Sequence, residues 1–66
     1  MNEYVTNKVN HFRVDAGITQ EELAALVGVS RQTVIAIEKG NYTPSLLLGI
    51  KIARFFKKPV EEVFKY

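Results

Sequence analysis

Arg31 and Gln32 are adjacent side chains whose types and spacing could do specific chemistry. A guanidinium can donate two parallel hydrogen bonds to guanine O6 and N7, and a carboxamide can donate and accept at adenine N6 and N7. On a helix that turns by about 100° per residue, both residues fall on the side away from Val34 and Ile37. The apolar pair would anchor the helix to a core. We therefore expect a helix that presents its two polar residues to the major groove of DNA.

The rest of this outer face carries smaller groups. Ile35 and Ala36 follow at helical spacing, and Lys39 ends the same stripe. An exposed isoleucine is either a contact for a thymine methyl group or an incidental surface residue. Arginine and glutamine are also common on solvated surfaces, so Arg31 and Gln32 are either base contacts or ordinary surface residues. The short turn that precedes this open face favours DNA contact.

A pair of capped helices is predicted to position this face. Thr19 begins the sequence TQEE, a capping box in which a hydroxyl and a carboxylate each satisfy a free backbone N–H. Gly28 is typical of the left-handed residue that ends a helix, and Ser30 is a preferred cap of the next one. Gly40 ends the second helix in the same way. Two capped helices joined by so short a glycine turn predict a helix-turn-helix over residues 19–40.

A first helix is expected before this pair. Apolar residues recur at helical spacing from Val5 to Ala16, and Gly17 supplies a natural end. Either Thr6 or Asn7 could cap its N-terminus.

Two more helices are expected after the pair. Ser45 would cap a fourth helix that continues to about Lys57, and Pro59 would begin a short fifth helix over residues 60–64. The sequence contains no internal repeat and no linker. It therefore predicts one all-α domain over residues 1–66, a compact five-helix bundle.

Composition limits the function. The net charge of +2 and the pI near 9.1 permit nucleic-acid binding without requiring it. A single histidine, no cysteine and no glycine-rich phosphate loop leave no plausible catalytic set, so we expect neither an enzyme nor a cofactor. His11 and Asp15 stand four residues apart, but without a third ligand in view they predict a surface pair rather than a metal site. No apolar run is long enough to span a membrane or to form a signal peptide, so a cytoplasmic location is expected and no membrane partner. A closed core this small also leaves little space for a small-molecule ligand.

The C-terminal third carries more apolar surface than one small domain needs. Apolar residues cover roughly 220° of the fourth helix, whereas a one-sided amphipathic helix needs little more than about 100°. The surplus predicts a dimerisation region over residues 46–66 and therefore a homodimer. The interface residues expected there are Leu48, Phe55, Val60, Val63, Phe64 and Tyr66.

The segment TQEELAALVGVSRQTVIAIEKG, followed by PSLLLGIKIA, resembles the phage-repressor-like (Cro/CI-type, XRE) helix-turn-helix family. Ala24, Gly28, Val34 and Ile37 stand at the framework positions of that family, and the resemblance spans residues 9–64. It implies a five-helix fold, double-stranded operator DNA as the partner, a homodimer and repression of transcription in a prokaryote. A two-fold dimer would bind a pseudo-palindromic operator whose half-site centres lie about 34 Å apart.

The resemblance also implies roles for individual residues. Gln20 would contact the phosphate backbone, and Arg13 and Glu38 would form an ion pair between the first and third helices. Ala36 stands where relatives often carry a base-reading polar side chain, so fewer base hydrogen bonds are expected here. The full set of expected DNA contacts is Gln20, Ser30, Arg31, Gln32, Thr33, Ile35, Lys39, Asn41 and Tyr42.

Several alternatives stay open at this point. In some short members of the family the chain ends pair as a small antiparallel sheet, which Tyr4–Val5 and Phe64–Lys65 could form. A repressor of a phage or mobile element and an antitoxin-like autoregulator would share the same DNA chemistry. A protein-interaction module that keeps the fold without reading DNA is the alternative class, and the long polar groups on the open helix face argue against it.

Overall fold

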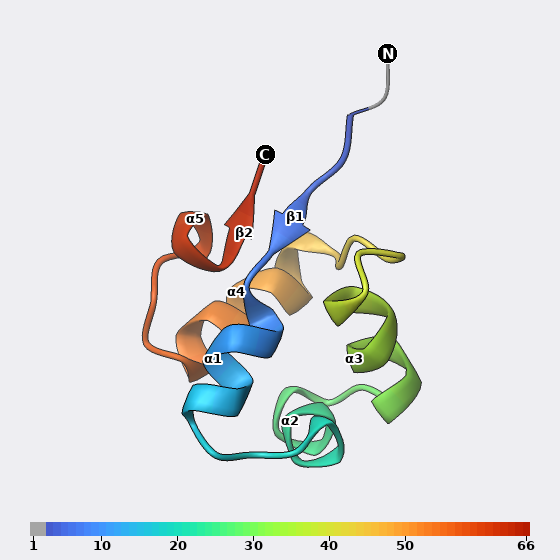
Figure 1. The fold of residues 1–66 in the computed structure, drawn as a ribbon, viewed down its shortest axis with the longest axis vertical. Helices are drawn as coiled ribbons and strands as arrows, with labels where there is room; N and C mark the ends of the chain where they lie inside the picture. The colour runs from blue at the N-terminus through green and yellow to red at the C-terminus, as the bar shows by residue number, and fades with distance from the viewer. Residues whose placement is uncertain (1–2) are drawn as a thin grey trace.

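Five helices and two short strands make up the fold of residues 3–66, which the computed structural model describes (Figure 1). In chain order these are β1 (Thr6–Asn7), α1 (Val9–Asp15), α2 (Gln20–Val27), α3 (Arg31–Glu38), α4 (Leu46–Phe55), α5 (Val60–Val63) and β2 (Phe64–Lys65). The expected five-helix fold, with a helix-turn-helix and paired chain ends, is confirmed. Within the described residues, no helix combines the length and the apolar character needed to cross a bilayer.

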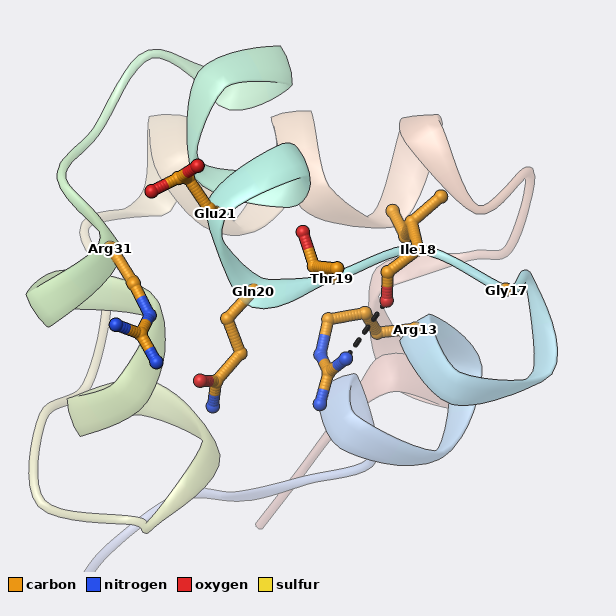
Figure 2. A pocket seen from close by; sticks show the side chains of 7 residues that line it. All are labelled: Arg13, Gly17, Ile18, Thr19, Gln20, Glu21 and Arg31. Atoms are coloured by element: carbon orange, nitrogen blue, oxygen red, sulfur yellow. Dashed lines mark hydrogen bonds between the residues drawn. The ribbon is translucent and has the colours of Figure 1, made fainter.

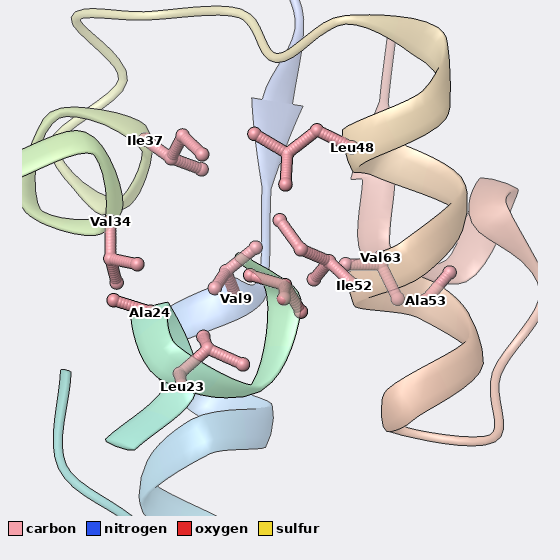
Figure 3. Packing of buried hydrophobic residues seen from close by; sticks show 10 residues of the cluster. Val9, Leu23, Ala24, Val34, Ile37, Leu48, Ile52, Ala53 and Val63 are labelled. Carbon is pink, nitrogen blue, oxygen red and sulfur yellow. The ribbon is translucent and has the colours of Figure 1, made fainter. Parts of the chain in front are cut away.

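One apolar core holds the five helices together (Figure 3). Each helix supplies at least one side chain with essentially no exposed surface: Val9, Leu23, Ile37, Ile52 and Val63, in chain order. Removing a side chain of this size from water contributes roughly 1.5–3 kcal/mol. Because no cysteine is present, this core and a few polar contacts hold the small chain together.

The caps of the helix-turn-helix form as the sequence predicts. The Thr19 hydroxyl accepts from the backbone N–H of Glu22 at 3.0 Å, and the Glu22 carboxylate accepts from the backbone N–H of Thr19 at 2.8 Å. Gly28 ends α2 with a φ of 80°, in the left-handed region that glycine enters without strain. Ser30 then caps α3 by accepting from the backbone N–H of Thr33 at 3.3 Å. These local bonds fix the turn between α2 and α3.

The chain ends pair in a different register from the one expected. β1 and β2 are antiparallel, with Thr6 opposite Lys65 and Asn7 opposite Phe64. The expectation that Tyr4–Val5 would pair with this C-terminal segment is therefore wrong by two residues. Pairing continues one residue further, since the Lys8 N–H donates to the Val63 carbonyl at 2.8 Å.

The first helix begins at Val9, because Thr6 and Asn7, the two residues considered as its cap, form β1 instead. The side chain of Asn7 explains the change. Its Oδ1 accepts from the Val9 N–H at 3.0 Å, and its Nδ2 donates to the Ile37 carbonyl at 2.8 Å. One residue of β1 therefore supports the first turn of α1 and ties the strand to the last turn of α3.

α4 ends at Phe55, two residues before the expected end at Lys57. Lys57 has a φ of 57°, and it is the one non-glycine residue among residues 3–66 in the left-handed region. The N–H of Lys58 then donates to the Ala53 carbonyl at 3.0 Å, which closes the helix end. Pro59 disfavours helical backbone at the residue before it, so the chain has to leave α4 at this point.

Substituting Lys57→Gly is expected to stabilise the protein by about 0.5–1 kcal/mol, because glycine adopts this backbone without the steric cost of a Cβ. Denaturant unfolding of both proteins measures the difference. The matched control is Lys58→Gly, at a position with ordinary backbone, which is expected to lower stability. A Lys57→Gly variant less stable than the parent would contradict the account of this helix end.

Candidate nucleic-acid interface

The carboxylate of Glu38, at the end of α3, is the most highly connected polar group in the described chain. It accepts from Arg13 Nε at 2.6 Å and Arg13 Nη2 at 3.2 Å, from Asn10 Nδ2 at 3.0 Å and from Gln20 Nε2 at 3.1 Å. These donors come from α1 and from the first residue of α2. The Glu38 side chain is only 5% exposed. One buried carboxylate thus joins α1, α2 and α3. The ion pair between Arg13 and Glu38, which the family resemblance implies, is present.

The environment of Glu38 keeps it ionised. Burial by itself raises the pKa of this carboxyl group, but the hydrogen bonds from Arg13, Asn10 and Gln20 and the positive charge of Arg13 outweigh burial. The net effect is a pKa below the ordinary value of 4.5. Arg13 is held from its other side as well, because its Nη1 donates to the Ile18 carbonyl at 2.9 Å.

The outer face of α3 is open, as the spacing predicts. Val34 and Ile37 have no exposed surface and pack into the core. Arg31 and Gln32 are exposed in the first turn of the helix, and Ile35 behind them is half-buried. The helix is therefore fixed from its inner side and at its C-terminal end, while the polar side chains of its N-terminal end stay free.

An open hollow runs beside this end of α3 (Figure 2). The residues that line it are Arg13, Gly17, Ile18, Thr19, Gln20, Glu21 and Arg31. Figure 2 shows the Gln20 carboxamide between the guanidinium groups of Arg31 and Arg13. The structure thus brings together two residues expected to contact DNA, Gln20 and Arg31. It also adds Glu21, for which sequence reasoning offered no role.

Gln20 is constrained more than the sequence indicates. It is half-buried, and one proton of its Nε2 is used by the bond to Glu38. A carboxamide nitrogen carries two donor hydrogens. The second remains available for a phosphate oxygen, so the role implied for Gln20 is compatible with its position.

The other polar residues of the predicted set are distributed around α3. Thr33 and Tyr42 line a second hollow with Lys51, and Lys39 lines a third with residues of the N-terminal segment. The Thr33 hydroxyl lies 3.2 Å from that of Ser30, so both hydroxyls also serve the helix cap. Asn41 is exposed, and its backbone N–H donates to the Ala36 carbonyl at 2.9 Å, a bond that stabilises the turn after α3.

His11 does not stand within a cluster of metal-binding residues. Its ring packs edge-on against Phe12, with ring centroids 5.3 Å apart. Among residues 3–66 there is no group of three histidine, cysteine or acidic side chains placed to hold a metal ion.

Two residues expected at a dimer interface belong to the core of the single chain. Leu48 is 8% exposed and Val63 is fully buried, so neither offers apolar surface to a second copy. The expectation for these two is wrong because Leu48 lies on the side of α4 that faces α2 and α3, with its side chain directed towards Ile37, and because α5 packs Val63 against α4 (Figure 3). The leucines of α4 that project instead are Leu46, which is 76% exposed, and Leu47, which is 64% exposed.

The remaining interface candidates do not share one surface. Val60 and Phe64 line a groove that is almost entirely apolar, together with Val5, Thr43, Pro44, Ser45, Leu46 and Gly49. Phe55 belongs to another groove, with Leu26, Lys51 and Arg54 among its neighbours. Tyr66 is exposed and donates its hydroxyl to Glu3 at 2.6 Å.

Known proteins resemble this chain over most of its length. A family model described as "Helix-turn-helix" matches residues 11–63. An uncharacterized HTH-type transcriptional regulator of Methanocaldococcus jannaschii is 55% identical over 60 residues, which cover 91% of each chain. The cryptic phage CTXphi transcriptional repressor RstR of Vibrio cholerae is 36% identical over 58 residues, which cover 88% of this chain and 52% of the relative.

A solved structure extends the similarity to three dimensions. The restriction-modification controller protein C.AhdI of Aeromonas hydrophila superimposes with a TM-score of 0.76 at 31% identity, with 83% of each chain covered. The resemblance stated from the sequence is therefore confirmed by sequence and by fold.

Replacing Glu38 by glutamine is expected to destabilise the fold by about 2–4 kcal/mol at pH 7, because Arg13 loses its charged partner. Since the folded-state pKa of Glu38 is lowered, its contribution is complete above the ordinary value of 4.5 and is lost as the pH falls through the folded-state pKa. Denaturant unfolding at pH 7, 4 and 3 should therefore show the two proteins converging towards low pH.

Asn10→Ala serves as the milder variant in case Glu38→Gln does not fold. It removes one donor to the same carboxylate and is expected to cost about 1 kcal/mol. An unfolding free energy of Glu38→Gln equal to that of the parent at pH 7 would contradict the role of this carboxylate.

Proposed function

The chain belongs to the helix-turn-helix family of transcriptional regulators, and we propose that it represses transcription by binding a pseudo-palindromic operator as a homodimer. The observation that carries this proposal is the exposed pair Arg31 and Gln32 at the free end of a helix anchored from behind. Membership of the family makes the protein a DNA-binding transcriptional regulator. The repressor role, the operator symmetry and the dimer are the parts that we propose.

In the proposed complex, α3 enters the major groove with its N-terminal end foremost. Arg31 donates both arms of its guanidinium to a guanine, and Gln32 bonds to a neighbouring adenine. Ile35 and Ala36 lie one turn further along, where small apolar groups allow close approach and contact with a thymine methyl. The remaining selectivity comes from the shape of the DNA, because few base-reading hydrogen bonds are available.

Phosphate contacts on both sides of α3 fix the register of the helix in the groove. Gln20 holds one strand from the first residue of α2, where free backbone N–H groups favour an anion. Around the cap and the C-terminal end of α3, the candidates for the flanking phosphates are Ser30, Thr33, Lys39, Asn41 and Tyr42.

Repression is supported by the named repressor among the relatives. A bound regulator of this kind represses by occupying promoter DNA that the transcription machinery needs. The phage-type and antitoxin-type variants of this role use the same protein surface.

A second copy of the chain is proposed to cover the apolar groove lined by Val60 and Phe64. Leu46 stands exposed at this groove, and a two-fold axis beside it would place each Leu46 against the groove of the partner. The longest dimension of the described chain is 36 Å, so two copies in contact can hold their α3 helices about 34 Å apart, one turn of DNA.

The proposal is tested by selecting bound duplexes from a random pool and measuring the affinity of the selected duplex over a range of salt concentrations. We expect two half-sites related by a dyad, with centres about 10 base pairs apart, bound about 10³-fold or more tightly than a scrambled duplex. A pool that yields no enriched sequence, or a selected duplex bound no better than the scrambled one, would refute sequence-specific binding.

Arg31→Ala is expected to weaken binding to the selected duplex by roughly 1–3 kcal/mol and to relax the preference at one base position. Gln20→Ala is expected to weaken the selected and scrambled duplexes alike, because phosphates carry no sequence. Arg54→Ala is the control, since Arg54 is exposed in the groove around Phe55. Fluorescence anisotropy on folded variants measures all three. If Arg31→Ala bound the selected duplex as tightly as the parent protein does, the proposed docking would be ruled out.

Leu46→Glu is expected to convert the dimer to a monomer, because a carboxylate without a partner would be buried in an apolar contact. Analytical ultracentrifugation at micromolar concentration reports the change. Leu26→Glu is the matched control, at a leucine that is 59% exposed in the other groove, and it should stay dimeric. A monomeric parent protein, or dissociation caused by the control alone, would contradict the proposed interface.

A further inference from the structure

The hollow beside Arg31 contains one charged residue that the proposed docking does not use. Two arginines line it, but Arg13 is already neutralised by its ion pair with Glu38. The charges that remain are Arg31 and Glu21, which are both exposed. The formal charge of this hollow is therefore close to zero, although the whole chain carries a net charge of +2.

Among residues 3–66, the Glu21 side chain has no hydrogen-bond or ion-pair partner. The capping box of α2 uses the neighbouring Glu22, whose carboxylate accepts from the Thr19 N–H. Neither a hydrogen bond nor an ion pair connects the Glu21 carboxylate to residues 3–66, and Arg31 likewise forms no ion pair with any of them. Figure 2 shows the two residues on neighbouring helices at the edge of the hollow, with the Glu21 carboxylate and the Arg31 guanidinium directed away from each other. The two charges are thus free to influence whatever approaches them.

We propose that Glu21 is a specificity-determining residue that competes with backbone phosphates for the Arg31 guanidinium. The proposal rests on the proposed DNA-binding function. A phosphate that enters the hollow meets a carboxylate of the same sign, and the guanidinium that would bind this phosphate is attracted to Glu21 as well. Both effects weaken binding that depends on the DNA backbone alone.

The competition between Glu21 and phosphates for Arg31 affects DNA of random sequence more than it affects the operator. On a random sequence, Arg31 has no matching base and must bond to a phosphate in the hollow next to Glu21. On the operator, Arg31 extends into the groove to a guanine, away from the carboxylate. Glu21 therefore weakens random binding more than operator binding and raises the ratio between them.

The experiment compares Glu21→Gln with the parent protein on the selected duplex and on a scrambled duplex of equal length, at 50 and 150 mM salt. The dissociation constant for the scrambled duplex is expected to fall about threefold at the lower salt, as for one unit charge roughly 7 Å from a phosphate in water. The dissociation constant for the selected duplex should fall less. Both effects of Glu21→Gln should be smaller at the higher salt, because salt screens the charges.

Glu22→Gln is the matched control. It makes the same change of charge in the same turn of α2, and glutamine keeps the capping box. Because the Glu22 side chain is bound to the Thr19 N–H and does not line the hollow, this variant should change the scrambled-duplex constant much less. In an Arg31→Met background, Glu21→Gln should have a smaller effect, because the competition for the guanidinium is absent and only the direct repulsion between Glu21 and a phosphate remains.

Three results would overturn the inference. Glu21→Gln could leave the dissociation constant for the scrambled duplex unchanged, it could tighten binding to both duplexes equally, or the control Glu22→Gln could have the same effect as Glu21→Gln. An acidic residue in the first turn also favours the helix. If this were the whole role of Glu21, its replacement would lower the melting temperature and leave DNA binding unchanged. A parent protein that binds neither duplex would instead refute the proposed function itself.

Discussion

The buried carboxylate of Glu38 is the constraint on which the rest of the structure depends. A charge that is 5% exposed is tolerable in a small core only when hydrogen bonds replace its lost water. Arg13, Asn10 and Gln20 supply those bonds from α1 and α2, so the position of α3 is set by groups on two other helices. Removal of Arg13 would leave the carboxylate without its countercharge, whereas removal of Asn10 or Gln20 would take away a single hydrogen bond.

The orientation of the candidate interface follows from this constraint. Glu38 and the bond from Asn7 to the Ile37 carbonyl hold the C-terminal end of α3, and Val34 holds the inner face. The N-terminal end is left as the free part of the helix, with Arg31 exposed there. Because Gln20 bonds to Glu38 and also lines the hollow beside Arg31, the same carboxylate connects the core to the surface proposed to meet DNA.

Local features of the sequence predicted much of this structure. The caps at Thr19 and Ser30 and the inner face of α3 were predictable because each depends on residues within four positions of one another. The Arg13–Glu38 pair came from the family resemblance, since no local pattern relates two residues that lie 25 positions apart. The additional donors to Glu38 were missed for the same reason. Nothing in the types of Asn10 and Gln20 indicates that they converge on one carboxylate.

Longer-range packing accounts for the errors. A strand of two residues has no periodicity, so the register of β1 against β2 could not be read from the sequence. The wheel of α4 gave the extent of its apolar surface but not the parts that α2, α3 and α5 cover, which is why Leu48 was expected at the surface and Leu46 was left out of the expected interface residues.

The central claim, that the free end of α3 reads bases, is tested most directly by NMR of the isotope-labelled protein bound to its selected duplex. The account predicts intermolecular NOEs from the Arg31 and Gln32 side chains to base protons in the major groove. It also predicts that the exposed side chains of Lys51 and Arg54 on α4 show no such contacts. Base contacts from α4, with α3 remaining in solvent, would contradict it.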